Sequence, residues 1–146
     1  MEIVDKWDSH RAERVGSVFR AQPLMQALGV KLVTVSAGEA SLQMSCRNEH
    51  MQHHGVLHGG VVATLLDAAC GAAAFSLMLE GEGVVVVEFK VNFLEPAVGI
   101  EIAAIGKVKR AGNRLVACVA DAFIVEKKDT TVATMLATLL RIPSSS

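Results

Sequence analysis

The 146-residue sequence contains no tyrosine, one tryptophan and three prolines. Its three cysteines, Cys46, Cys70 and Cys118, are far apart, which is typical of buried thiols in a reducing compartment rather than of a disulfide framework. The net charge is -1 with no block of like charge, so nucleic acid is not expected as a partner. The first residues lack a cationic segment followed by an apolar run, so no signal peptide is predicted and we expect a cytoplasmic protein.

Apolar residues, in contrast, make up 51% of the chain and charged residues 20%, which is a globular composition. The length suffices for one domain with a substantial core. We therefore expect a single domain over residues 1–146, with an N-terminal helical segment at 8–28 and a core at about 30–142.

The segment from Gly59 to Leu79 is almost entirely apolar or small, with one acid, Asp67. A helix that is apolar on all sides is either a core helix or a membrane span. A span is disfavoured because an aspartate near its centre would cost about 3 kcal/mol, and because the flanks carry no nearby Lys or Arg. The segment therefore predicts a buried helix and no association with a membrane.

Strand patterns lie on both sides of this helix. In residues 84–93, Val87, Phe89, Val91 and Phe93 are predicted to face one way and Glu88, Lys90 and Asn92 the other. Further strands are predicted over residues 30–37, 40–46, 100–109, 115–126 and 131–142. The last three form an antiparallel meander. The order predicts an α+β fold in which the buried helix lies on one face of an antiparallel sheet.

Two features of the helix indicate chemistry. Asp67 is costly to bury unpaired, so it is interpreted as a general base or nucleophile, or else as an acid satisfied by a structural hydrogen bond at a subunit interface. Gly59 and Gly60 open the helix, where unpaired N–H groups suit an oxyanion, and the Gly60 N–H is the preferred donor.

The spacing of Gln52, five residues, His58-Gly59-Gly60 and then Asp67 resembles the hotdog-fold acyl-CoA thioesterases. The segment 87–97, VEFKVNFLEPA, also resembles the strand and turn after the helix in that family. The resemblance is closest to the phenylacetate-degradation and 4-hydroxybenzoyl-CoA thioesterase groups. Two departures are the pairing of Gln52 with Asp67, and Val86 near the place where many relatives have a hydroxyl residue.

The resemblance implies a curled antiparallel sheet wrapped around one long central helix. It implies hydrolysis of an acyl- or aryl-CoA to the free acid and CoA, with no cofactor. Gln52 would orient the water or the thioester carbonyl, and His58 would shape the loop. The alternatives are a hotdog dehydratase or hydratase acting on acyl carriers, and a non-catalytic acyl-CoA binding module. The acyl group, the pathway, and the choice between nucleophile and base for Asp67 stay open.

Other polar clusters have weaker interpretations. His50, His53, His54 and His58 match no zinc spacing, so no metal is predicted. Lys107, Lys109, Arg110 and Arg114 flank one hairpin, either as solvated charge or as a binding surface for the phosphates of coenzyme A. Asn92 and Lys90 are weaker candidates for substrate binding.

The distance between the donor and the acid predicts the assembly. Asp67 lies seven residues beyond Gly60, or about 10 Å along the helix axis, which its side chain cannot span. A second helix running antiparallel across a two-fold axis would bring the partner's acid to the first donor. We therefore expect a homodimer or homotetramer whose active site lies at the subunit interface.

Overall fold

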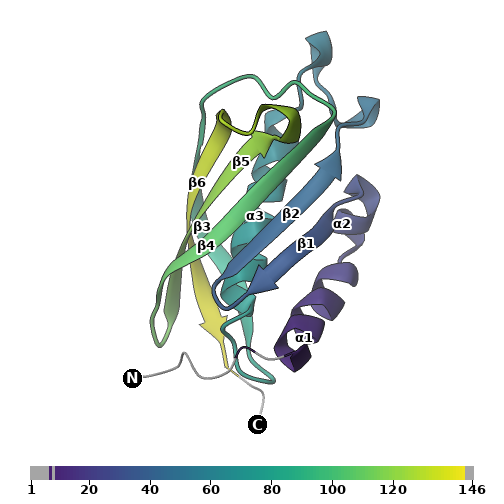
Figure 1. Cartoon of the computed structure of the whole chain (residues 1–146). Helices are drawn as coiled ribbons and strands as arrows, with labels where there is room; N and C mark the ends of the chain where they lie inside the picture. Colours follow the sequence, from purple (N-terminus) through teal and green to yellow (C-terminus); the bar gives the residue numbers. More distant parts are fainter. Residues whose placement is uncertain (1–6, 8, 144–146) are drawn as a thin grey trace.

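One long helix, surrounded by a curled six-stranded sheet, organises the described part of the chain (Figure 1). The computed structural model describes Trp7 and residues 9–143, so position 8 and both ends of the expected 1–146 domain lie outside the described residues. The helices are α1 (Ser9–Arg20), α2 (Pro23–Leu28) and α3 (Gly59–Phe75). The strands are β1 (Lys31–Ser36), β2 (Glu39–Ser45), β3 (Gly83–Phe93), β4 (Glu101–Ala111), β5 (Leu115–Ile124) and β6 (Thr131–Ile142).

The sheet has the strand order β1-β2-β4-β5-β6-β3, and every neighbouring pair is antiparallel. Strands β4, β5 and β6 form the predicted meander, and β3 returns to pair with β6 at one edge. Helices α1 and α2 lie beside β1, at the other edge (Figure 1). The α+β fold predicted from the sequence is confirmed.

Small residues let the central helix approach the sheet closely. Ala69, Ala73 and Ala74 of α3 are fully buried. A Cβ atom on Gly106 of β4 would lie 2.3 Å from the backbone oxygen of Ala69, so only glycine fits at that crossing. The helix is therefore packed backbone to backbone against the strand.

The helix ends earlier than predicted, at Phe75 rather than near Leu79. The hydroxyl of buried Ser76 donates to the Ala73 carbonyl at 2.6 Å and accepts the Gly38 N–H at 2.8 Å. These bonds fix Ser76 at the helix end, although the apolar pattern continues beyond it. No helix within the described residues is long and apolar enough to cross a membrane.

The predicted alternation in β3 is partly wrong, because Val87 lies in a β-bulge between Val86 and Glu88. Phe89, Val91 and Phe93 pair with β6 residues whose side chains are buried, so they face the core side of the sheet. Phe89 and Phe93 are nevertheless 44% and 55% exposed. The core side of this edge strand is therefore only partly covered by its own chain.

Candidate functional site

The connection between β2 and α3 forms a loop that lies above the start of the helix and is closed by hydrogen bonds between its own residues (Figure 1). It contains two short 3-10 turns, Asn48–His50 and His53–Gly55, and an isolated bridge pairs Met51 with Leu57. The Gln52 side chain is exposed, and its amide nitrogen donates to the Leu57 carbonyl at 3.4 Å. His54 has a φ of 67°, a conformation that non-glycine residues rarely adopt. The loop therefore holds Gln52 at the helix N-terminus.

In the first turn of α3, the N–H group without a partner is not the one preferred on sequence grounds. The Gly60 N–H, preferred on sequence grounds, donates to Nδ1 of the N-capping residue His58 at 2.9 Å. The N–H groups of Val61 and Val62 donate to the His58 carbonyl. Among the described residues, only the Gly59 N–H of this turn has no partner. The sequence shows two glycines but not which N–H a capping side chain will occupy.

A hollow of about 510 Å³ lies against this free donor. Its wall comes from the loop, including Gln52, from the start of α3, and from the turn after β3. A Cβ on Gly59 would lie 3.2 Å from the Phe93 ring, so glycine keeps the donor and the aromatic wall close together. Phe93, Leu94 and Pro96 of this wall were not proposed as site residues, although the Glu95-Pro96 turn signalled a change of direction there.

Asp67 lies further along the same helix and is not part of this wall. Its Oδ1 atom is buried and has no hydrogen-bond partner among the described residues. Burial raises the pKa of the carboxyl above its ordinary value. Eight residues separate it from Gly59, or about 12 Å along the axis. A single chain thus presents an unpaired donor and an unpaired acid that do not reach each other.

The basic hairpin lies at the other end of the molecule from the loop (Figure 1). Lys109, Arg110 and Arg114 are exposed around the turn between β4 and β5. Along β4 they are roughly 30 Å from the helix N-terminus, at 3.3 Å per residue. Lys107 forms an ion pair with Glu39 at 3.5 Å. The predicted phosphate-binding residues are therefore not gathered at the hollow within one chain.

The other two predicted substrate contacts, Lys90 and Asn92, are exposed on β3. They alternate with the core-facing residues of that strand, so they lie on its outer side. The chain therefore places them on a different face of the sheet from Gln52 and Gly59.

The histidines do not form a common cluster. His50 is buried against Arg47, whereas the His53 and His54 rings pack edge to face, with centroids 4.6 Å apart. No group of three or more His, Cys, Asp or Glu side chains in the part of the chain that the structure describes could hold a metal ion.

Comparison with known proteins places these features in context. Residues 54–132, more than half of the chain, match the model of the thioesterase superfamily. A crystal structure of a thioesterase family protein from Silicibacter pomeroyi is 42% identical, with a TM-score of 0.87, and the match covers 90% of this chain and 98% of that one. Human acyl-coenzyme A thioesterase 13 is 29% identical over 70% of this chain and 74% of its own length. The PaaI protein of the E. coli phenylacetic acid degradation operon shares the fold at 22% identity, with a TM-score of 0.84 over 94% of this chain and 97% of that one.

Proposed function

The chain belongs to the thioesterase superfamily and is a thioester hydrolase, and on that premise we propose that it hydrolyses an acyl- or aryl-coenzyme A. One observation carries the proposal. The free Gly59 N–H and the buried, unpaired Asp67 oxygen occupy one helix, and both are left without a partner among the described residues. A thioester with an attacking water supplies the missing partner of each.

The Gly59 N–H is the oxyanion donor in this mechanism. It points from a helix N-terminus, where the partial positive charge stabilises an anion. A single such donor is worth about 3 kcal/mol in the transition state. Gln52 stands at the same hollow, with its amide nitrogen held by the Leu57 carbonyl, so its amide oxygen can accept a hydrogen bond from water.

Asp67 is the acid that activates the reaction. As a general base it takes a proton from water, the water oxygen bonds to the carbonyl carbon, and the carbon–sulfur bond then breaks. As a nucleophile its oxygen bonds to the carbonyl carbon, the carbon–sulfur bond breaks to release the coenzyme A thiolate, and water then cleaves the resulting anhydride while its proton goes to the thiolate. In both cases the products are the free acid and coenzyme A, and no redox change or cofactor is needed.

Two copies of the chain complete the site. An antiparallel partner helix brings its Asp67 opposite the Gly59 of the first chain, and two-fold symmetry makes two equal sites. The β3 edge supports this assembly because its core-facing Phe89 and Phe93 are about half exposed in the single chain. The active site is then shared: Gln52 and Gly59 from one subunit, Asp67 from the other.

The direct test is thiol release from a panel of acyl- and aryl-CoA substrates. Asp67→Asn keeps the shape of the side chain but removes its charge, so kcat should fall by roughly 10²–10⁴ while KM changes little. A hydratase or a binding module would release no thiol from any substrate. Near wild-type turnover of Asp67→Asn would overturn the role of this residue.

A further inference from the structure

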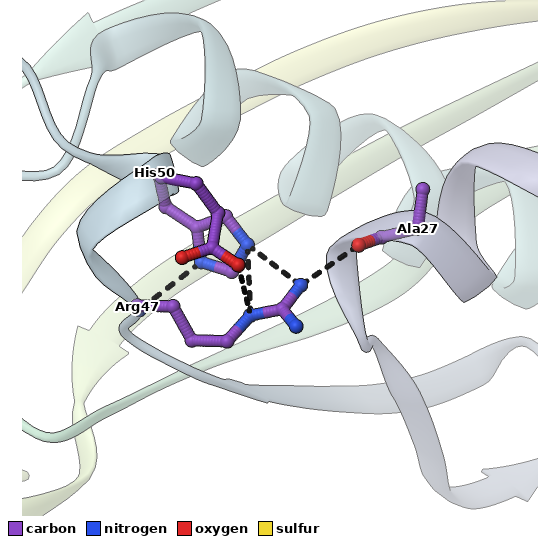
Figure 2. A network of polar contacts seen from close by, with 4 residues as sticks. Ala27, Arg47 and His50 are labelled. Carbon is purple, nitrogen blue, oxygen red and sulfur yellow. Dashed lines mark hydrogen bonds and ion pairs between the residues drawn. The ribbon is translucent and has the colours of Figure 1, made fainter.

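His50 is a buried polar residue in an otherwise exposed part of the loop. It is 2% exposed, whereas Gln52, His53 and His54 are all exposed. Its Nδ1 accepts the Arg47 backbone N–H at 3.2 Å, and its Nε2 lies 3.1 Å from the Arg47 Nη2 (Figure 2). The imidazole ring is therefore contacted on both nitrogens by the same arginine.

Arg47 also connects this ring to the N-terminal helices. Its Nη2 donates to the Ala27 carbonyl at 2.7 Å, in the last turn of α2 (Figure 2). Carbonyls in the last turn of a helix lack intrahelical partners, so an arginine is a suitable donor to them. On its exposed side Arg47 forms an ion pair with Glu49 at 3.4 Å. The arginine thus ties the loop to a helix that lies far away in the sequence.

His50 also contacts His58, the residue that directly precedes the Gly59 donor. Its carbonyl accepts the His58 N–H at 3.0 Å, so the two residues close the base of the loop. The peptide group that follows His58 carries the Gly59 N–H, which makes the orientation of this donor depend on the His50–His58 pair. Gln52 lies within the closed segment.

We propose that Arg47 and His50 are positioning residues, which orient the Gly59 N–H and the Gln52 side chain by fixing the loop to the end of α2. The inference rests on the proposed function of that site. Ala27, Arg47 and His50 all lie outside the range 54–132 that matches the family model, so this support is added by the rest of the chain.

Arg14 provides a matched control for Arg47. It too joins an N-terminal helix to a backbone carbonyl, that of Met78, and it stacks on the Phe75 ring at 5.2 Å. These contacts lie at and just after the C-terminal end of α3. Arg14→Ala therefore removes a comparable anchor without touching the loop.

The experiment measures kcat, KM and thermal stability for Arg47→Ala, His50→Asn and Arg14→Ala. An oxyanion donor acts mainly in the transition state, so Arg47→Ala should lower kcat about tenfold at nearly constant KM. His50→Asn keeps an acceptor for the Arg47 backbone N–H and should lose less activity. Arg14→Ala should lower the melting temperature but keep wild-type kcat below it. Equal losses of kcat in both arginine variants, or wild-type kcat in Arg47→Ala, would overturn the proposal.

A second readout does not depend on turnover. In protein labelled with [15N]glycine, the amide resonances of Gly59 and Gly60 should shift in Arg47→Ala and stay in place in Arg14→Ala. Unmoved resonances in Arg47→Ala would refute the positioning role even if the enzyme is active. If the resonances shift but the wild-type protein hydrolyses no thioester, Arg47 still positions the loop, and the proposed function is refuted instead.

Discussion

The two ends of α3 differ in how their polar groups are treated. At the C-terminal end, Ser76 fills both its donor and its acceptor role within the fold, with Ala73 and Gly38. At the N-terminal end, Gly59 keeps an N–H without a partner among the described residues, beside a hollow of about 510 Å³. Both ends belong to one helix and face the same need to satisfy backbone groups. The polar groups at the C-terminal end are thus satisfied within the fold, whereas the N-terminal end leaves a donor available to a ligand.

Asp67 extends this contrast into the middle of the helix. A buried carboxylate oxygen without a hydrogen-bond partner destabilises a protein. Such a cost is expected where a ligand or a second subunit provides the missing contact. The following experiments test whether the unpaired groups of α3 serve the reaction and the paired groups serve the stability of the fold.

The largest expected effect is recovery of activity from two inactive variants. Gln52→Ala and Asp67→Ala are each expected to be inactive, because each lacks one part of the shared site. Refolded together in equal amounts, half of the dimers are mixed, and each mixed dimer has one intact site. About a quarter of all sites should then hydrolyse substrate in a thiol-release assay. No recovery, with mixed dimers shown by mass spectrometry, would mean that each site is built within one chain.

The next effect is that removal of the Asp67 charge should raise stability and lower activity. Burial raises the pKa of Asp67, so its folded pKa lies above the unfolded one. Stability from the protonated form is present below the unfolded pKa and is lost as the pH rises through the folded pKa. At neutral pH the charge therefore destabilises the fold, and Asp67→Asn should raise the melting temperature while it removes activity.

The pH profile of the wild type provides a check on the same shift. Since hydrolysis needs the ionised acid, kcat should fall on the acid side at a pH above the range of an ordinary aspartate. The stability prediction is tested by calorimetry of the wild type and of Asp67→Asn at neutral and at acidic pH. An Asp67→Asn variant that melts lower than wild type at neutral pH would show that the charge has a structural partner.

A smaller effect is expected at the other end of the helix. Ser76→Ala leaves the Gly38 N–H without its acceptor, at a cost of about 1–2 kcal/mol. For a chain of this size the melting temperature should fall by about 3–6 °C. Turnover below that temperature should be unchanged, as measured by thiol release. A large fall in kcat would show that both ends of α3 take part in the reaction.

The fold could be predicted from the sequence because its patterns are long and regular. The all-apolar helix and the alternating strands can bury their apolar surfaces against each other when the helix packs on an antiparallel sheet. What escaped prediction depended on single side chains. Ser76 ends the helix through a hydrogen bond to Gly38, which is distant in the sequence, and Val87 interrupts the alternation of β3 by forming a bulge.

The candidate site was predictable in part for a similar reason. The sequence indicates Asp67 because a buried acid needs a partner, the two glycines because they open the helix, and Gln52 through the family resemblance. It favours the Gly60 N–H as donor, because the capping bond to His58 is not visible in the sequence. The sequence also gives no indication of the positioning role proposed for His50. In the sequence His50 is one of several polar residues, which indicates an exposed loop position. Its burial against Arg47 is not visible there, because Arg47 is held by a carbonyl in the last turn of α2.

The smallest expected effect concerns the basic hairpin. At 3.3 Å per residue along β4, Lys109, Arg110 and Arg114 lie roughly 30 Å from the free donor of their own chain, so we expect them to reach the phosphates of coenzyme A only at the site of another subunit. At the lower end of the range of about 0.2–1 kcal/mol for each exposed charge, replacing all three by Gln should raise KM about threefold. The increase should shrink at high salt. The matched control is an acyl-pantetheine substrate, which lacks the nucleotide phosphates and should show the same KM with both proteins. An unchanged KM for every acyl-CoA would identify the hairpin as ordinary surface charge, and an equal rise for acyl-pantetheine would mean that the substitutions disturb the fold rather than phosphate binding.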